Sequence, residues 1–327
     1  MNHATRQAIY RDIEAERSTK VIAFVTGERA GLQTQIAADA IVPFVSVLDN
    51  IGPTQKLSLV LDTNGGQTSA AWRLINLIRS FCEELEVIVP LKAMSSGTLM
   101  ALGADKIVMT KQAALGPIDP SLDNHPLAPL VGVPGNPSGV RMPVSAEAVR
   151  GYIDEVKKDV TDPAALASVW THLASQIHPL VLGQVFRAGG QIRALASELI
   201  KVQVKDETVQ NEIIQLLCSD SGSHDYTINR RKAADLGLAV EKPSFDLYQK
   251  LIQISQSYTA ELKTHEPYVP AALLGGHAAA NYLLVRGLVE STAESYGYVS
   301  EGQLSMAPGG VPNVVDQPTF EGWRKLP

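Results

Sequence analysis

Residues 57–66 read LSLVLDTNGG, and this stretch contains the alternation that decides the predicted fold. The run LSLVL has the aliphatic composition of a strand that is buried on both of its faces. The glycine pair that follows it leads into residues 70–85, where Ala71, Leu74, Ile75 and Ile78 recur at helical spacing. A buried strand followed closely by an amphipathic helix is the basic unit of an α/β protein.

The same alternation continues on both sides of this stretch. Strand-like runs occur at residues 21–26, 87–89 and 106–109, and helix-like segments occur at 33–50 and 98–104. Because crossovers between parallel strands are right-handed and carry helices, this order predicts a parallel sheet covered by helices. We therefore predict an α/β fold with repeated β-α units.

The second half of the chain has a different character. Residues 117–143 are rich in Pro, Gly and Asn and are predicted to form an extended loop, and residues 145–217 carry the periodicity of long helices. We place a boundary near residue 245, between a main domain at 1–245 and a C-terminal helical extension at 246–327 that ends in a Pro- and Gly-rich tail. Helices are expected in this extension at 247–262 and 271–288, and residues 296–299 read as a strand-like run.

The composition excludes several classes of protein. The chain has 327 residues, a formal net charge of -6 and a pI near 5.7, which argues against nucleic acid as a partner. Its two cysteines, Cys82 and Cys218, are expected to be reduced core thiols. No stretch resembles a membrane-spanning helix or a signal peptide, so we expect a cytoplasmic protein with no membrane span. The scattered histidines predict no metal site, and we expect no cofactor.

Two short segments combine small residues with a predicted helix N-terminus. Gly65 and Gly66 follow the strand at 57–61, and their backbone N–H groups are suited to holding an anion or a developing oxyanion. Ser95 and Ser96 stand in the turn AMSSGT that leads into the helix at 98–104, where the helix dipole favours an alkoxide. Taken alone, the glycines fit an ordinary tight turn and the serine fits an ordinary N-cap.

A third segment, GSHDY at residues 222–226, precedes a predicted helix at 229–236. His224 and Asp225 are a candidate base and its orienting carboxylate, although sequence neighbours often point apart. An aspartate that caps a turn is the alternative interpretation of this pair.

The order and spacing of these segments resemble the serine dehydrogenase proteinase family, a branch of the Clp protease/crotonase superfamily that is related to signal peptide peptidase A. The resemblance rests on LDTNGG, AMSSGTLMALGADKIVMT, LGPIDP and SHDYTINRRKAADLGL, and it extends from about Arg6 to Val240. It implies a Clp/crotonase-like fold.

The resemblance also assigns roles to residues. It implies that Ser95 is the nucleophile, with Ser96 as the fallback, and that Gly65, Gly66 and the Ser96 N–H form the oxyanion hole. Asn64 stands where the family usually has proline. Asp225 falls on the position of the Clp triad aspartate.

The triad histidine has no counterpart, because Pro117, Ile118 and Asp119 occupy its region. Signal peptide peptidase A uses a lysine after the nucleophile helix instead, and desolvation can lower a lysine pKa enough for it to act as a base. Lys157 and Lys158 are the candidates for that role, although they also fit a solvated helix C-terminus. His224 and His125 are further candidates.

Two functions remain open at this point. One is a cytoplasmic serine peptidase that hydrolyses peptides or unfolded proteins through a Ser95 acyl-enzyme, with Lys158 or His224 as base. The other is a non-proteolytic binding or scaffold protein of the same fold that lacks a competent base. The resemblance implies a homo-oligomer in either case: a trimer, a hexamer or a larger ring.

Overall fold

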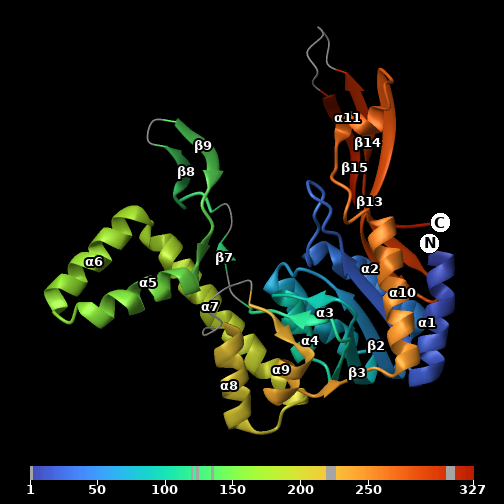
Figure 1. Cartoon of the computed structure of the whole chain (residues 1–327), viewed down its shortest axis with the longest axis horizontal. Helices are drawn as coiled ribbons and strands as arrows, with labels where there is room; N and C mark the ends of the chain where they lie inside the picture. Colours follow the sequence, from blue (N-terminus) through green and yellow to red (C-terminus); the bar gives the residue numbers. More distant parts are fainter. Residues whose placement is uncertain (1–2, 119–120, 123–124, 134–135, 219–225, 307–313) are drawn as a thin grey trace. The chain divides into compact units, whose positions relative to one another are not determined.

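The computed structural model describes residues 3–118, 121–122, 125–133, 136–218, 226–306 and 314–327. The chain forms two compact units (Figure 1). Unit 1 comprises Met1–Gly116, Leu199–Lys205 and Thr227–Pro327, and unit 2 comprises Pro117–Glu198 and Asp206–Tyr226. The boundary that we predicted near residue 245 is wrong, because the segment that follows it completes the sheet of unit 1.

An eight-stranded sheet in the order β12-β5-β3-β2-β1-β13-β14-β15 is the framework of unit 1. The strands from β12 to β1 are parallel, and β13, β14 and β15 continue the sheet in antiparallel pairs. Their bounds are Lys20–Thr26 (β1), Thr54–Asp62 (β2), Cys82–Val89 (β3), Lys106–Met109 (β5), Val240–Glu241 (β12), Ala279–Ser291 (β13), Ser295–Met306 (β14) and Val314–Lys325 (β15). The predicted α/β fold with parallel β-α units is confirmed.

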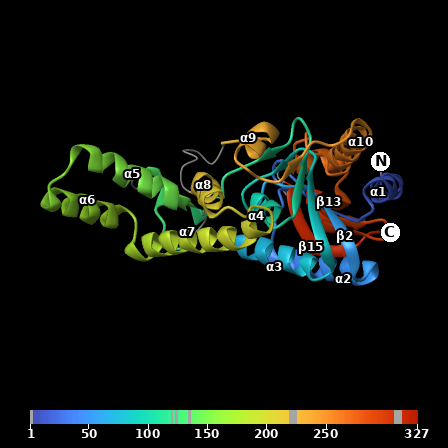
Figure 2. The same cartoon turned by 90° about the horizontal axis from the view of Figure 1, so that it is seen from below.

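Helices cover both faces of this sheet (Figure 2). Helices α1 (His3–Arg17) and α10 (Phe245–Glu261) pack on one face, where Val60, Tyr258 and other buried side chains form a core. Helices α2 (Ile41–Ile51) and α3 (Thr68–Arg79) lie on the other face. The residues Ala70, Ala71, Leu74, Ile75 and Ile78 of α3 recur at helical spacing and are buried, and burial of each large aliphatic side chain contributes about 1.5–3 kcal/mol.

A buried charged network joins α1 to α10 and β13. The fully buried Arg6 guanidinium donates two hydrogen bonds to Glu290, at 2.7 and 2.6 Å, and further bonds to Ser257 and Glu261. Tyr10 donates to the same Glu290 carboxylate. Burial by itself would raise the pKa of Glu290, but its bonds to Arg6 outweigh burial and lower it. The network holds these three elements together and leaves its charges paired.

Short elements of unit 1 surround the start of α4 (Ser96–Leu102). Strands β4 (Lys92–Ala93), β6 (Ala114–Leu115) and β11 (Ile228–Asn229) form a small separate sheet. The remaining elements of unit 1 are η1 (Ala38–Ala40), η2 (Ile200–Val202), α9 (Arg230–Asp235) and α11 (Pro270–Leu274).

The C-terminal extension that we expected to be helical is mostly sheet. Helix α10 is present, but the helix predicted at 271–288 is wrong: α11 ends at Gly275, which adopts a left-handed conformation, and β13 follows. Strand β13 pairs with β1 through Val25 and Leu288, and it pairs with β14 along most of its length. The apolar run of β13 fits a helix or a strand by itself. Its pairing with strands that are distant in sequence decides that it is a strand.

Unit 2 contains the long helices. They are α5 (Ala146–Asp159), α6 (Pro163–Gln176), α7 (Pro179–Leu199) and α8 (Glu207–Cys218). The segment predicted to be a loop at 117–143 contains strands: β8 (Leu130–Val133) pairs with β9 (Asn136–Arg141), and β7 (Ser121–Leu122) pairs with β10 (Val144–Ser145).

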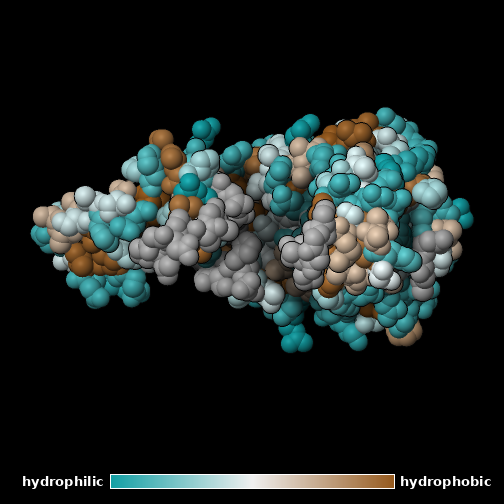
Figure 3. All heavy atoms as spheres, turned by 90° about the horizontal axis from the view of Figure 1, so that it is seen from above, coloured by the Kyte–Doolittle hydropathy of each residue, from teal (hydrophilic) through white to brown (hydrophobic). Residues whose placement is uncertain are grey.

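Apolar side chains of unit 2 reach its surface. None of the residues of α6 is buried, and Trp170 on this helix is 42% exposed. Figure 3 shows apolar residues among the polar ones on one face of the molecule. Within the described ranges, none of the helices has the length and hydropathy that crossing a bilayer requires.

Candidate active site

Ser95 occupies the turn between β4 and α4 in an unusual conformation. It is the N-cap residue of α4, with φ 51° and ψ -118°, and it is half-buried. Its side chain accepts no capping hydrogen bond from the helix. Other N-cap side chains of this chain do accept such a bond, namely those of Ser145, Asp162, Asn229 and Ser244. The Ser95 hydroxyl is therefore not used for capping, and the ordinary N-cap interpretation does not describe it.

The positive φ of Ser95 is a strained feature. Within the described ranges, the non-glycine residues with positive φ are Ser18, Ser95 and Lys263. Such a conformation costs on the order of 1–3 kcal/mol, persists only where the surroundings enforce it, and is frequent at functional sites.

Gly65 lies directly against this turn. It has φ 104°, and a Cβ atom at this position would lie 2.7 Å from the Met94 carbonyl oxygen, 2.8 Å from Ser95 Cβ and 3.2 Å from the Ser96 nitrogen. Only glycine allows the two segments to approach so closely. Gly66, with φ 149°, is packed in the same way against the backbone of Ile36. The structure therefore brings Gly65, the first glycine of the predicted pair, against the predicted nucleophile.

The backbone N–H groups near Ser95 differ in their availability. The Gly65 N–H donates to Thr63 Oγ1 at 2.9 Å. The Ile36 N–H donates to the Gly65 carbonyl, and the Ile36 carbonyl accepts the N–H of Gln67. Neither bond uses the N–H of Gly66, which lies between these two residues in sequence. Ser96 is the first residue of α4, and the first N–H groups of a helix have no partner within it. The Gly65 N–H is thus already used within the chain, whereas these bonds leave the N–H groups of Gly66 and Ser96 unused.

Two threonines that the sequence analysis did not single out hold this turn. Thr63 accepts the Gly65 N–H, and its hydroxyl also shares a hydrogen bond with Thr26. The fully buried Thr98 hydroxyl lies 2.7 Å from the Ala93 carbonyl oxygen and 2.8 Å from that of Gly116, and it accepts the Gly116 N–H. Both threonines lie within the motifs quoted above, but no local pattern distinguishes them there.

The candidate bases among the described residues belong to unit 2. Lys158 belongs to α5 in unit 2; its side chain is 67% exposed and paired with Glu155, and this hydrogen bond raises its pKa. A neutral lysine base needs a lowered pKa instead. Lys157 is also exposed, and His125 Nδ1 accepts the N–H of Leu127.

His224 and Asp225 lie outside the described residues, as does Asp119. The assignment of a base therefore stays a prediction. For metals, the described ranges contain no group of three His, Cys, Asp or Glu side chains that could hold an ion.

Comparisons with known proteins found several chains that are similar to this one. Two uncharacterized proteins of Methanocaldococcus jannaschii are each 26% identical to this chain, over 246 and 239 residues, which cover 72% and 70% of this chain and 73% and 69% of the relatives. A serine-to-alanine mutant of the 1510-N membrane-bound stomatin-specific protease is a similar solved structure (16% identity, TM-score 0.31, 71% of this chain and 85% of that chain). A probable enoyl-CoA hydratase/isomerase from Mycobacterium abscessus is another (10% identity, TM-score 0.32, 72% and 69%).

The family comparison covers the candidate site. Residues 1–135, which include Gly65, Gly66, Ser95 and Ser96, match the family model of the ClpP-like SDH-type serine proteinases. The resemblance to the serine dehydrogenase proteinase family is thereby confirmed, and residues 1–135 carry it.

Proposed function

We propose that this chain is a serine peptidase that uses Ser95 as its nucleophile. The conformation of Ser95 is the observation that carries the proposal: a half-buried serine at a helix N-terminus, held at positive φ, with a hydroxyl that caps nothing. Strain of this kind is expected where a side chain must be presented to a substrate. The match of residues 1–135 to ClpP-like serine proteinases supports the same reaction class.

The proposed reaction is acyl transfer in two steps. Ser95 Oγ attacks the scissile carbonyl carbon while a base takes its proton, and the N–H groups of Gly66 and Ser96 stabilise the oxyanion. The tetrahedral intermediate then releases the amine product, which receives the proton, and leaves an acyl ester on Ser95. Attack by water on the ester releases the acid and restores the serine. The Gly65 N–H already donates to Thr63, so the contribution of Gly65 is its close approach to Ser95.

The base in this reaction is taken from the sequence. Lys158, Lys157 and His224 remain the candidates for the base from the sequence, with Asp225 as the candidate orienting carboxylate. For Lys158 to act, it must lose its partner Glu155 and become desolvated, because its present environment raises its pKa. The alternative function, a non-proteolytic binding or scaffold protein, is favoured by the absence of a hydrogen bond to the Ser95 hydroxyl among the described residues.

The substrate and assembly of this peptidase are also proposals. A peptide or an unfolded protein segment is the substrate that the reaction class suggests. Assembly into a homo-oligomer is supported by α6, none of whose residues is buried and whose Trp170 is exposed. Light scattering on the purified protein measures the assembly directly, and a monomer at all concentrations would contradict it. The cytoplasmic location stays a prediction.

Intact-mass labelling with a fluorophosphonate tests the nucleophile. The wild type is expected to gain one adduct, Ser95→Ala to gain none, and Ser96→Ala to label like the wild type. Ser96→Ala is the matched control because it removes the neighbouring hydroxyl from the same helix end. No adduct on the folded wild type, where a known serine hydrolase labels, would favour the non-proteolytic alternative.

A further inference from the structure

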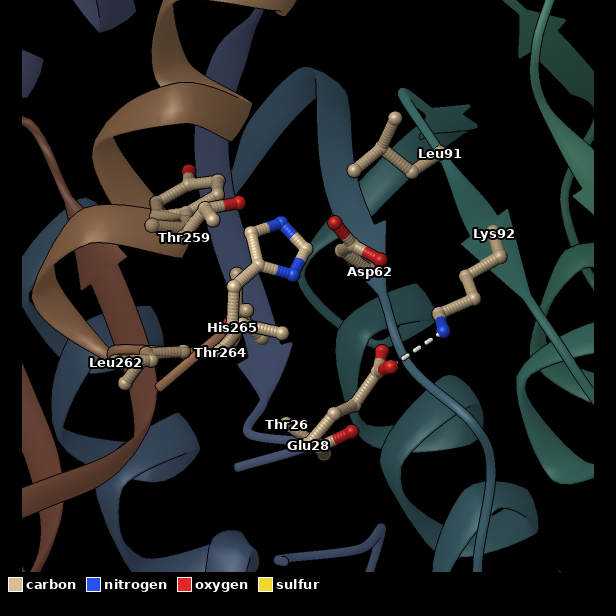
Figure 4. Close-up of a pocket in the computed structure, with 11 residues that line it drawn as sticks. Thr26, Glu28, Asp62, Leu91, Lys92, Thr259, Leu262, Thr264 and His265 are labelled. Atoms are coloured by element: carbon tan, nitrogen blue, oxygen red, sulfur yellow. Dashed lines mark hydrogen bonds and ion pairs between the residues drawn. The ribbon is translucent and has the colours of Figure 1, made fainter. Parts of the chain in front are cut away.

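A small pocket lies at the carboxyl ends of β1 and β2. Its walls come from β1, β2, β4, the C-terminal part of α10 and the residues that follow α10, and its volume is about 140 Å³. Figure 4 shows the side chains of Glu28, Asp62, Lys92 and His265 around this space. The carboxyl ends of parallel strands are where open α/β sheets bind their ligands.

This pocket is separate from the Ser95 turn. Side chains alternate between the two faces of a strand, and Val60 packs in the core beneath α10. Asp62, two residues later, faces the same side and lines the pocket. Leu61 and Thr63 face the other side, where their side chains lie against Gly97 of α4. The pocket therefore lies on the α10 face of the sheet, and Ser95 lies at the start of a helix on the opposite face.

Asp62 is the unexplained group in this pocket. It is only 8% exposed, and within the described part of the chain no side chain or backbone group donates a hydrogen bond to its carboxyl group. In Figure 4 the dashed line joins Glu28 and Lys92 and leaves Asp62 without a bond, while the ring of His265 is directed toward it. Buried polar groups are nearly always hydrogen-bonded, so an unpartnered carboxyl group that faces a pocket points to an absent ligand.

The charges around Asp62 favour a cation. Glu28 and Lys92 form an ion pair at 2.6 Å and so balance each other. His265 is exposed and lies at the border of the pocket, and Tyr258 completes the set of ionisable groups that line it. Burial, followed by the charge of Glu28, raises the pKa of Asp62 to about 7, and Lys92 opposes this effect only in part. An anion would meet the carboxylates of Glu28 and Asp62 here, whereas a cation would neutralise the Asp62 carboxylate, which no ion pair balances.

The lining of the pocket also indicates which kind of cation fits. The described ranges hold no group of three His, Cys, Asp or Glu ligands for a metal. Thr259 and Thr264 line the pocket together with Asp62, and an ammonium group has three N–H donors for acceptors such as carboxylate and hydroxyl oxygens. Beyond Thr259 and His265, a shallow, mostly apolar groove continues past Leu91 along α10. A charged head with an aliphatic chain matches this combination.

We propose that this pocket binds a protonated primary amine, with the ammonium group on the Asp62 carboxylate and the aliphatic chain along Leu91 into the groove on α10. A free alkylamine and the N-terminal amine of a peptide with an apolar first residue share this chemistry. The site does not depend on the peptidase function, because none of its residues takes part in the reaction proposed for Ser95.

Isothermal titration calorimetry of the full chain with butylammonium chloride tests the proposal. We expect saturable binding to the wild type and equally to Ser95→Ala, about tenfold or more weaker binding to Asp62→Asn, and no binding of uncharged 1-butanol. Asp62→Asn keeps the size of the side chain and removes its charge. No saturation up to about 20 mM amine, or equal binding to Asp62→Asn, overturns the proposal.

A second measurement works on the wild type and so does not require the variant to fold. At about pH 6 the Asp62 carboxyl group is mostly protonated, because its pKa is raised to about 7. Binding of an ammonium ion there must expel this proton, so buffers of different ionisation enthalpy report release of close to one proton per amine. The release should vanish above about pH 8.5. Binding without proton release at pH 6 contradicts a site on Asp62.

The source of the amine is decided by a parallel titration. Leucine amide and its N-acetylated form have the same aliphatic chain and differ in the ammonium group. Tighter binding of leucine amide than of butylammonium would identify a peptide N-terminus as the ligand, and the reverse order would identify a free amine. Binding of the acetylated form as tight as that of leucine amide contradicts the proposal.

Discussion

Replacement of Gly65 by alanine perturbs its contact with the turn at residues 94–96, which contains Ser95, the nucleophile that we propose. The added Cβ atom would lie 2.7 Å from the Met94 carbonyl oxygen, 2.8 Å from Ser95 Cβ and 3.2 Å from the Ser96 nitrogen. Two of these three neighbours are backbone atoms of the turn that positions Ser95, so relief requires movement of the turn itself. The substitution should therefore reduce both stability and the reactivity of Ser95.

The expected size follows from two separable costs. The positive φ of Gly65, 104°, makes any L-residue strained there, at about 1–3 kcal/mol. The forced contacts add about 1–3 kcal/mol, as for overpacking in a core, so Gly65→Ala should lower the free energy of unfolding by about 2–6 kcal/mol. Gly52→Ala is the matched control: Gly52 has φ 70°, but a Cβ atom there meets nothing within 4 Å. It carries only the first cost, about 1–3 kcal/mol.

Tryptophan fluorescence during urea unfolding measures these free energies. Trp170 belongs to unit 2, whereas Trp72 and Trp323 belong to unit 1, so a Trp170→Phe background reports on unit 1 alone. Fluorophosphonate labelling of the folded variants then follows the reactivity of Ser95. Gly65→Ala should label more slowly than Gly52→Ala. If both variants lose the same stability and label at the wild-type rate, the close packing of Gly65 on the turn at Ser95 is refuted.

Three further changes test separate parts of unit 1 by the same unfolding assay. Ser96 Oγ is buried without a partner among the described residues, so Ser96→Ala should leave stability unchanged or raise it by about 1 kcal/mol; a loss of labelling would instead make Ser96 the nucleophile. Arg6→Met leaves the Glu290 carboxylate buried and should cost about 3–5 kcal/mol, and a cost under about 1 kcal/mol would contradict the buried network. The Asp62 pKa of about 7 lies above its value of 3.8 in an unfolded chain, so folding disfavours the ionised form and stability falls as pH rises between these values. Asp62→Asn should therefore stabilise the protein by a few kcal/mol at about pH 8 and little at about pH 4, and a gain independent of pH would refute this.

The parallel part of the sheet was predictable because its signal is local. Leu57, Leu59, Val60 and Leu61 are fully buried, and a strand with helices on both of its faces needs such a continuous apolar run. The same holds for α3, whose apolar spacing appears within one segment of sequence. Information inside a window of ten to fifteen residues sufficed for these elements.

Strand β13 shows where local information ends. Its residues pair with β1 on one side and with β14 on the other, and Val25 of β1 is separated from its partner Leu288 by most of the chain. The apolar run around Leu288 fits a helix equally well until these partners are known. The error at residue 245 has the same origin, because a chain that returns to complete an earlier sheet leaves no local signal of its return.

The candidate site was predictable in its parts but not in its geometry. The order of the motifs identified Gly65, Gly66 and Ser95, but no pattern showed that the Gly65 N–H is donated to Thr63. The pocket around Asp62 was missed altogether, since it draws His265 from a segment far from β2 in sequence. Only the fold brings these residues together.

The hydrogen bonds around Ser95 offset the strain of its backbone conformation. Backbone hydrogen bonds join Thr63 to Lys92 and to Met94, and Thr98 ties the helix that follows to the Ala93 carbonyl. Each such bond contributes about 0.5–1.5 kcal/mol, so together they offset a conformational cost of about 1–3 kcal/mol. These bonds all lie within the chain, so the protein itself holds the strained backbone conformation of Ser95. If Ser95 is the nucleophile that we propose, an oxyanion site beside it requires little reorganisation during the reaction, which is the condition under which backbone N–H groups stabilise a transition state most effectively.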